Sequence, residues 1–344
     1  MRSIDFPKHQ ERKRNVLDNF VFSTRVRVAR NLEGIKFPHM LSEKEKSDIN
    51  EQLIKYISNL PVDITLESLD EMPREKVLIY QSNHIITNEF IRNGRVLAYD
   101  ISGNWVMLLN EDDHIRIFSI EEGYNIKSMY NRISSILIQL ENEIDFAFDE
   151  KFGYLTASAM NFGTGLRLSA LVNLYGLAGE KNIENFIDTA NKTGYSVTNI
   201  AASSNDSPLF YVCNIFSLGI SEEELVSEFD NFLQRTMEVE MDCRKAFFIK
   251  QDELDLSLEE ILEINKKDSL DWNNLVYYIS LIDALNKKHI TADNINRTRN
   301  LIFQCTDEYL QYKLMIEPND IPGVRINMLK NCISNLKYKN RSIS

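Results

Sequence analysis

Short apolar runs separated by turn residues fill residues 76–120, and this pattern most restricts how the chain can fold. The expected strands are Lys76–Tyr80, Arg95–Asp100, Trp105–Leu109 and His114–Ile120. Asn93-Gly94 and Ser102-Gly103-Asn104 lie between them, and residues of these types favour tight turns. Because tight turns join antiparallel neighbours, the pattern predicts an antiparallel meander.

Three consecutive carboxylates lie within this meander, in the stretch Asn110-Glu111-Asp112-Asp113-His114-Ile115-Arg116-Ile117. Carboxylates this close repel one another and raise each other's pKa unless a cation offsets them. One interpretation is a solvated turn between two hairpin strands. The other interpretation is the edge of a site that faces a cationic substrate.

Two arginines alternate with valines in another strand, which is expected over Phe20–Asn31. Period-two alternation places Arg25 and Arg27 on one face of that strand. Adjacent guanidinium groups destabilise a protein when they are buried without anions, so the pair indicates an oligophosphate clamp. The alternative is a surface pair with carboxylate partners.

A glycine-bearing loop, Asn161-Phe162-Gly163-Thr164-Gly165-Leu166-Arg167, is the third segment of interest. Glycines let backbone N–H groups approach a phosphate, which the arginine after the loop would neutralise. Leu168 interrupts a G-x-G-x-x-G pattern and no G-x-x-x-x-G-K-[ST] motif occurs, so neither a dinucleotide-binding fold nor a P-loop is predicted. The alternative is an ordinary turn.

Bulk composition excludes several classes of protein. The 344 residues are 43% hydrophobic and 26% charged, as in a soluble globular protein, and the net charge of -12 argues against nucleic acid as the main partner. No apolar run approaches the roughly 20 residues that span a bilayer, and the polar N-terminus lacks a secretory signal. The four scattered cysteines form no C-x-x-C pair, which favours a reducing, cytoplasmic location without a zinc site.

A change of pattern near residue 250 predicts a domain boundary. Residues 1–18 are expected to be a flexible N-terminus, residues 19–250 an α+β domain and residues 251–344 a smaller helical domain. In the first domain helices are expected over Ser42–Leu60, Asn125–Phe148, Asn182–Thr193 and Ser221–Phe248, and further strands over Tyr195–Ala202 and Leu209–Leu218. In the second, strand patterns vanish and helices are expected over Ser257–Lys267, Asp268–Asn286, Thr291–Glu308 and Arg325–Leu336.

The three charged segments together supply four arginines beside a carboxylate cluster: Arg25, Arg27, Arg116 and Arg167. Arginines from several strands suit phosphoryl transfer, in which catalysis is mostly positioning and charge neutralisation around a Mg-nucleotide. A carboxylate nearby would orient and deprotonate a cationic nucleophile such as a guanidinium.

Four segments resemble the ATP:guanidino phosphotransferase family, and its bacterial protein-arginine kinase (McsB-like) branch is the most similar. Their order and spacing agree with the family from about residue 20 to residue 250, and the helical tail is also similar to that branch. The segments are Ser23–Asn31, Asn110–Ile117, Asp149–Thr156 and Asn161–Arg167.

The resemblance implies an α+β fold, an antiparallel sheet flanked by helices, with a smaller C-terminal all-helical domain. It implies ATP as phosphoryl donor, with Mg²⁺ carried by the nucleotide and not by protein ligands, and the guanidinium of an arginine residue as acceptor. The catalytic residues it implies are Glu111 and Asp112, with Asp112 at the position of the base. The ATP-binding residues it implies are Ser23, Thr24, Arg25, Val26, Arg27, His84, Arg116 and Arg167.

The same resemblance contains departures in the expected site. The family's base is a glutamate, whereas Asp112 is one methylene shorter, and a shift of about 1 Å can cost about a hundredfold in rate. A substrate-contacting cysteine is replaced by Ser158. In the substrate loop a phosphate-binding arginine and a second catalytic glutamate are absent around Ser203, where Asp206 is a candidate replacement. The branch's phosphoarginine pocket corresponds to Asn319–Val324, which lacks its arginines and is expected to bind that group poorly.

Two functions follow from this pattern. The first is an active protein-arginine kinase with an atypical site. The second is a catalytically impaired pseudokinase that acts as a nucleotide- or protein-binding regulatory module. Expected partners are arginine-rich protein substrates and a second copy of the chain, as a homodimer through the helical domain, without nucleic acid or membrane.

Overall fold

The computed structural model describes residues 13, 15–93, 95–201, 207–286, 288–291, 295–334 and 336–338. The chain divides into two compact units. The first contains Ser23–Ala170 and Cys213–Asn231. The second contains the short segment 15–22, Leu171–Val212 and the chain from Phe232 onward.

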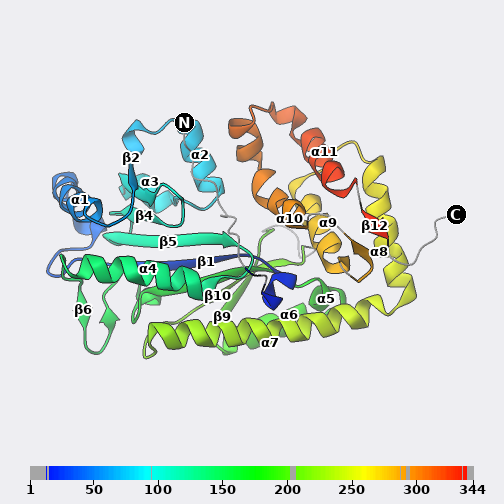
Figure 1. The fold of residues 1–344 in the computed structure, drawn as a ribbon, viewed down its shortest axis with the longest axis horizontal. Coiled ribbons are helices and arrows are strands. Elements are labelled where there is room, and N and C mark those ends of the chain that lie inside the picture. The colour runs from blue at the N-terminus through cyan, green and yellow to red at the C-terminus, as the bar shows by residue number, and fades with distance from the viewer. Residues whose placement is uncertain are drawn as a thin grey trace. The chain divides into compact units, whose positions relative to one another are not determined.

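An eight-stranded sheet carries the four predicted phosphate-binding arginines (Figure 1). The strand order is β2-β3-β4-β5-β1-β8-β10-β9, and the pairs from β2 to β1 are antiparallel. Arg27 lies opposite Phe118 and Ala29 lies opposite Arg116 in the β1–β5 register. The strands are β1 (Val21–Arg30), β2 (Ile64–Ser68), β3 (Val96–Asp100), β4 (Val106–Leu109), β5 (Ile115–Glu122), β8 (Leu166–Asn173), β9 (Tyr195–Asn199) and β10 (Leu209–Asn214).

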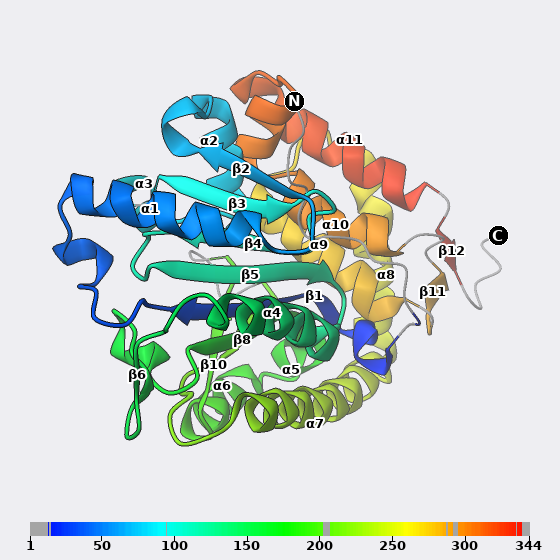
Figure 2. The same cartoon turned by 60° about the vertical axis from the view of Figure 1, so that its left-hand side comes forward.

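Helix α4 (Ile126–Glu141) covers one face of the sheet in the first unit, alongside β5 and β1 (Figure 2). Its side chains at helical spacing, including Met129 and Ile133, are fully buried. Thr24 faces this helix, because its hydroxyl donates to the Gly123 carbonyl at 3.0 Å and lies beside Met129. Alternation along β1 therefore directs Arg25 and Arg27 to the opposite face of the sheet.

Short elements complete the first unit. Helix α1 begins at a capping box in which Ser42 and Glu45 satisfy each other's backbone N–H groups. The remaining elements are α1 (Glu43–Ser58), α2 (Arg74–Ser82), α3 (Asn88–Asn93), the hairpin β6 (Phe148–Asp149) and β7 (Gly153–Tyr154), and the 3-10 turns Pro38–Met40, Leu69–Glu71 and Ala159–Asn161.

The second unit is mainly helical, and the long helix α7 (Glu222–Phe248) begins in the first unit and continues into it. Helix α9 (Trp272–Leu285) lies at its centre, with Leu275, Ile279 and Ile282 fully buried. Its other helices are α5 (Tyr175–Gly179), α6 (Ile183–Lys192), α8 (Gln251–Glu263), α10 (Ile295–Gln304) and α11 (Ile321–Ile333). Its minor elements are the 3-10 turns Val16–Asn19, Ile264–Lys266 and Pro318–Asp320, the π-turn Tyr309–Lys313 and the pair β11 (Ile290–Thr291) and β12 (Lys337–Tyr338).

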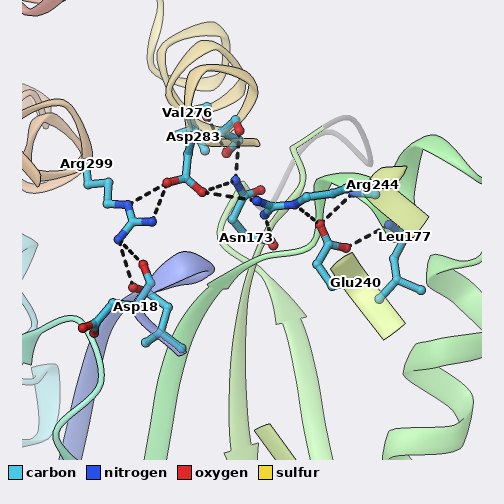
Figure 3. Close-up of polar contacts among 11 residues, drawn as sticks. Asp18, Asn173, Leu177, Glu240, Arg244, Val276, Asp283 and Arg299 are labelled. Atoms are coloured by element: carbon cyan, nitrogen blue, oxygen red, sulfur yellow. Dashed lines mark hydrogen bonds and ion pairs between the residues drawn. The ribbon is translucent and has the colours of Figure 1, made fainter. Parts of the chain in front are cut away.

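A buried polar network lies within the second unit (Figure 3). Arg299 donates through Nε to Asp283 at 2.8 Å, and the Asn173 amide donates to the same carboxylate at 2.9 Å. Arg244 pairs with Glu240 and donates to the Asn173 carbonyl at 2.8 Å. These five residues come from β8, α7, α9 and α10, so the network joins four elements that are distant in the sequence.

The predicted fold class, an antiparallel sheet flanked by helices with a helical C-terminal region, is confirmed. One predicted strand is wrong, because Lys76–Tyr80 lies within helix α2. A five-residue apolar run does not distinguish a strand from a buried helical segment, and here Pro73 precedes the helix while a C-terminal cap follows it. The strand at that edge of the sheet is β2, which the sequence pattern did not predict.

Other predicted boundaries shift or remain predictions. The helix expected over Asn125–Phe148 ends at Glu141. The domain boundary near residue 250 remains a prediction, and residues 1–12 and 14 of the expected flexible N-terminus lie outside the described residues. Among the helices of the described chain, none has the length and apolarity needed to cross a membrane.

Candidate functional site

Strand β1 presents Arg25 and Arg27 on the sheet face opposite α4. Both side chains are half-buried, whereas their neighbour Val26 is fully buried on the other face. The Arg25 guanidinium stacks over the Phe118 ring, 4.4 Å from its centroid. Arg27 donates to the Asn161 side chain at 3.3 Å. Arg25 is thus held by a contact with β5, and Arg27 by a contact with the glycine-bearing loop.

Four arginines from three strands converge here, and the pKa of Arg27 records their proximity. Burial, then the positive charges of Arg116, Arg25 and Arg167, lower the pKa of Arg27 from 12.5 to about 9, and Glu111 opposes this effect. The Nε atoms of Arg27 and Arg116 are buried and have no hydrogen-bond partner among the described residues. Such a cluster is destabilised by its own charge and would be stabilised by a bound polyanion.

Glu111 and Asp112 of the acidic turn both pair with Arg116 but differ in access. Glu111 is completely buried, where it pairs with Arg116 and accepts a hydrogen bond from the Thr87 hydroxyl. Asp112 lies 3.2 Å from Arg116, and 39% of its side chain is exposed. Burial raises the pKa of Glu111, while the charge of Arg116 opposes that rise. Glu111 therefore holds Arg116 in place, and Asp112 is the carboxylate of this pair that a substrate can reach.

Asp113 and His114, which follow in the same turn, are structural. Asp113 accepts hydrogen bonds from the Asn31 amide and from the backbone N–H of Ala157, both at 2.7 Å. His114 Nδ1 accepts from the Leu32 backbone N–H at 3.1 Å. Burial lowers the pKa of His114 to about 4, so its imidazole is neutral at pH 7. These contacts fix the turn against β1 and against the segment that leads into the glycine-bearing loop.

His84 ends α2 in the left-handed conformation, with φ of 55°. Its N–H donates to the Gln81 carbonyl, and the N–H of Ile85 donates to the Tyr80 carbonyl, which is the Schellman pattern. Glycine usually occupies this position, because a side chain there costs about 1 kcal/mol. The His84 side chain is exposed, and the surrounding protein followed by the charge of Arg25 lowers its pKa. His84 therefore lies near the arginine cluster at a position that is unfavourable for its backbone.

The glycine-bearing loop does not offer its backbone to a phosphate as the sequence suggested. The N–H groups of Gly163, Thr164 and Gly165 donate to the carbonyls of Phe152, Ser217 and Asn161, respectively. A Cβ at Gly163 would overlap the Ser217 carbonyl, and one at Gly165 would overlap the Ala29 carbonyl. Glycine is required here because three backbone segments cross, and only Arg167 after the loop joins the charged cluster.

The remaining predicted site residues lie in several places. Ser23 and Thr24 are buried on β1, and Thr24 faces α4. Ser158 is half-buried, and its carbonyl accepts from the Thr156 hydroxyl at 2.9 Å. Ser203 and Asp206 lie outside the described residues.

The segment predicted to correspond to a phosphoarginine pocket contains a short turn and the start of α11. Asn319 and Asp320 belong to the 3-10 turn Pro318–Asp320. The next arginine, Arg325, is buried, where it pairs with Asp307 and donates to the Cys305 carbonyl at 2.9 Å. Its guanidinium therefore holds the local fold together.

Sequence reasoning missed Thr87 and Asn161 as members of the site. Thr87 accepts from the Phe90 N–H at 3.1 Å, as a helix cap does, while its hydroxyl donates to Glu111. The segment Thr87–Phe90 has the residue types of a helix N-terminus, which was the available signal. Asn161 is the first residue of the glycine-bearing loop, but its contact with Arg27 depends on the crossing of β1 and the loop.

Comparisons with known proteins agree with this geometry. The family model described as ATP:guanido phosphotransferase, C-terminal catalytic domain, matches residues 45–243, which is more than half of the chain. The chain therefore belongs to the ATP:guanido phosphotransferase family.

Curated relatives with similar sequences are named protein-arginine kinases. The relative from Pelotomaculum thermopropionicum is 32% identical over 239 residues, which cover 66% of this chain and 67% of the relative. The relative from Clostridium acetobutylicum is 27% identical over 314 residues, which cover 86% of this chain and 92% of the relative.

Solved structures of two guanidino kinases share the fold. The duplicated taurocyamine kinase from Schistosoma mansoni, with bound transition-state analogue components, has a TM-score of 0.60 at 24% identity and is matched over 66% of this chain. This chain covers 33% of that duplicated protein, or about a third of its length. Lombricine kinase has a TM-score of 0.57 at 20% identity, over 65% of this chain and 66% of that one.

Proposed function

We propose that this protein transfers the γ-phosphoryl group of ATP to the guanidinium of arginine residues in proteins. The observation that carries the proposal is the charge balance of the candidate site. Four guanidinium groups meet two carboxylates there, and burial together with the like charges lowers the pKa of Arg27 to about 9. A cluster with excess positive charge inside a protein of net charge -12 is built for a polyanionic ligand such as a triphosphate.

The proposed donor is ATP with its magnesium ion. Phosphate oxygens would accept hydrogen bonds from Arg25, Arg27, Arg116 and Arg167, and His84 would border the nucleotide. Within the described part of the chain, no group of three or more His, Cys, Asp or Glu side chains is arranged to hold a metal ion. When bound, Mg²⁺ on the nucleotide would neutralise charge on the transferred group.

The proposed acceptor is an arginine guanidinium oriented by Asp112. A guanidinium nitrogen attacks the γ-phosphorus, a P–N bond forms, the P–O bond to ADP breaks and the acceptor gives up one proton. Asp112 is suited to hold the acceptor and receive that proton, since its carboxylate is reachable beside Arg116. The curated relatives named protein-arginine kinases support arginine residues of proteins as the acceptor class.

A second candidate is a nucleotide-binding module without turnover, and the state of Glu111 favours it. Glu111 is buried and committed to Arg116 and Thr87, so only one carboxylate of this pair remains for the acceptor. That carboxylate is the shorter aspartate. Self-association through residues 251–344 and a cytoplasmic location remain predictions for either candidate.

Two measurements on the same variants test these candidates. Titration calorimetry with MgATP is expected to give binding with the wild type and with Asp112→Ala, and strongly weakened binding with Arg167→Ala. Phosphoarginine on an arginine-rich protein, measured by mass spectrometry without acid, is expected with the wild type and not with Asp112→Ala. The exposed Arg235→Ala variant is the control and should match the wild type in both.

The outcomes separate the candidates. MgATP binding that depends on Arg167, without any phosphoarginine, would contradict the kinase and support the nucleotide-binding module. Phosphoarginine at equal levels with wild type and Asp112→Ala would remove Asp112 from the reaction. Absence of MgATP binding would contradict both candidates.

A further inference from the structure

A cavity of about 550 Å³ lies in the first unit, apart from the arginine cluster. Its walls are one side of α4, the β6–β7 hairpin and residues 218–223, which lead into α7. None of the four clustered arginines lines it. The cavity is therefore a separate recess, large enough for one or two side chains of a bound polypeptide.

The cavity wall already holds one guanidinium, that of Arg30. Its guanidinium carbon lies 3.5 Å from the centroid of the Tyr154 ring, and Nη2 pairs with Glu222 at 2.7 Å. Nη1 donates to the carbonyls of Ala29 and Thr164 at 2.9 and 2.7 Å. An aromatic face and a carboxylate are the groups that recognise a guanidinium, so the fold has built such a cage at the base of the cavity.

The same types of group are repeated elsewhere in the cavity lining, which also contains Lys151, whose ammonium lies 5.2 Å from the centroid of the Phe152 ring. Glu141 accepts from the Tyr154 hydroxyl at 2.9 Å, and Glu223 accepts from the Tyr130 hydroxyl at 3.0 Å. Among the described residues no Lys or Arg lies within ion-pair distance of Glu141, Glu223 or the third free carboxylate, Glu150. The tyrosine hydroxyls hold two of these carboxylates in place and leave their negative charge in the cavity.

Exposed apolar side chains are also part of the cavity lining. Ile138 is 57% exposed, Phe148 is 56% exposed and Leu218 is 52% exposed, and all three line it. Grouped apolar exposure of this kind marks an interaction site, because isolated proteins usually avoid it. A lining with more carboxylates than cations and with exposed apolar side chains is complementary to a basic side chain that has apolar neighbours.

The cavity also shares a wall with the candidate phosphoryl-transfer site. Gly163 and Thr164 line it, and two residues earlier in the same loop Asn161 accepts a hydrogen bond from Arg27. A chain bound in the cavity would therefore lie close to the site without occupying it.

We propose that this cavity is a docking site for an arginine side chain, flanked by apolar residues, of a substrate protein, and that this arginine is not the one phosphorylated. The proposal rests on the proposed function for the identity of the occupant as substrate. Docking raises the local concentration of neighbouring acceptor arginines, so it lowers KM for a protein substrate without changing the chemical step.

The test compares two triple variants with the same change in net charge. Glu141→Gln, Glu150→Gln and Glu223→Gln together remove the cavity's free carboxylates, all of which are exposed residues. Glu33→Gln, Glu51→Gln and Glu143→Gln together are the control, because these exposed residues do not line the cavity. The probe is a fluorophore-labelled Gly-Leu-Arg-Leu-Gly peptide with blocked ends, followed by anisotropy in the absence of nucleotide.

The cavity triple variant is expected to bind the peptide about tenfold more weakly than the wild type, since several carboxylate–guanidinium contacts are lost. The control triple and Asp112→Ala should bind within about twofold of the wild type. Replacement of the peptide's arginine by citrulline, which removes its charge, should also weaken binding about tenfold. With an arginine-rich protein substrate, the cavity triple should raise KM and leave kcat unchanged.

Equal binding by the cavity and control triples would overturn the proposal, as would absence of peptide binding by the wild type up to millimolar concentration. Loss of binding in Asp112→Ala but not in the cavity triple would place the peptide at the acceptor site, which also overturns docking while leaving the proposed function intact. Peptide binding that depends on the cavity carboxylates in a protein that makes no phosphoarginine would overturn the proposed function and retain the binding site.

Discussion

Two clusters of arginines, one in each unit of this protein, have the same chemistry but a different balance of charge. In the first unit four guanidinium groups meet the carboxylates of Glu111 and Asp112. In the second unit, the network in Figure 3 places two guanidinium groups, those of Arg244 and Arg299, against two carboxylates. Under the proposed function, the number of internal anions, and not the residue type, determines which cluster binds an external anion.

The cluster in the second unit is balanced, because Arg244 and Arg299 face Glu240 and Asp283. In this balanced cluster the arginines stabilise the fold. Both Arg299 nitrogens that face Asp283 donate to it, and a third nitrogen donates to the Asp18 carbonyl at 2.8 Å. Glu240 accepts from Arg244 and from the backbone N–H of Gly176 at 2.8 Å. Buried charges in such a network stabilise a particular arrangement of helices, and each partner depends on the others.

Removing one anion from the balanced cluster should have the largest effect. Asp283→Ala leaves Arg299 buried without its carboxylate, so the free energy of unfolding should fall by about 3–5 kcal/mol. Urea unfolding followed by circular dichroism measures this change. Asp242→Ala, at an exposed ion pair on α7, should change it by less than about 0.5 kcal/mol. A loss below about 1 kcal/mol in Asp283→Ala would show that the network does not support the fold.

The cluster in the first unit is unbalanced, because four arginines face only Glu111 and Asp112. Acid should destabilise the turn beside this unbalanced cluster through His114. Its pKa is about 4 in the fold and 6.5 in the unfolded chain, so the unfolded state binds more protons between these values. The stability that this difference provides is complete above pH 6.5 and is lost as pH falls toward 4, by about 3 kcal/mol.

Urea unfolding at several pH values should show this loss in the wild type. His114→Gln keeps an acceptor for the Leu32 N–H but does not titrate, so its stability should depend less on pH in the same range. Identical pH profiles for the two proteins would mean that His114 is not held neutral.

Removing one arginine from the unbalanced cluster should weaken MgATP binding and spare the fold. Arg27→Ala is expected to lower affinity about ten- to a hundredfold, as hydrogen bonds to a charged group are lost. Stability should hold or increase, because a guanidinium crowded by like charges is removed. Calorimetry and thermal unfolding measure the two effects, with Arg235→Ala as control.

The affinity for MgATP should also depend on pH. Above about pH 9 Arg27 loses its charge in the nucleotide-free protein, so wild-type affinity should fall as pH rises through that value. Arg27→Ala should lack this step. A large loss of stability in Arg27→Ala would instead mean that Arg27 supports the fold, as Arg299 does.

The smallest effect is expected at His84. His84→Gly should raise the free energy of unfolding by about 0.5–1 kcal/mol, since glycine fits the left-handed position but is more flexible when unfolded. It should weaken MgATP binding severalfold if the imidazole contacts the nucleotide as proposed. Glu75→Gly, within the same helix, should lower stability instead. A lower stability in His84→Gly would mean that the imidazole itself supports the cap.

The sequence predicted the members of the unbalanced cluster better than those of the balanced one. Alternation along β1 placed Arg25 and Arg27 on one face, and motif order added Arg116 and Arg167. The balanced cluster combines Asn173, Glu240 and Asp283 with two distant arginines, and no local period links such positions. Only the packing of four elements brings them together.

Within the site, neighbouring residues differed in ways that sequence spacing does not encode. Glu111 and Asp112 are adjacent, yet one is buried against Arg116 and Thr87 and the other is accessible. The turn conformation decides this, starting from Asn110 at φ of 52°. Likewise, the sequence suggested that the N–H groups of the glycine-bearing loop could bind a phosphate. The segments whose carbonyls accept from those N–H groups could not be identified from the sequence.

The crossing at Gly153, Gly163 and Gly165 has a consequence for how descent is inferred in such chains. At each position a Cβ would overlap the backbone of another segment, so the fold itself forbids substitution there. A lineage that lost phosphoryl transfer is still expected to retain these glycines, because a side chain at any of them would displace the backbone of another segment. These glycines therefore indicate a shared fold and ancestry. Evidence that phosphoryl transfer is retained has to come from the charged residues, above all Asp112.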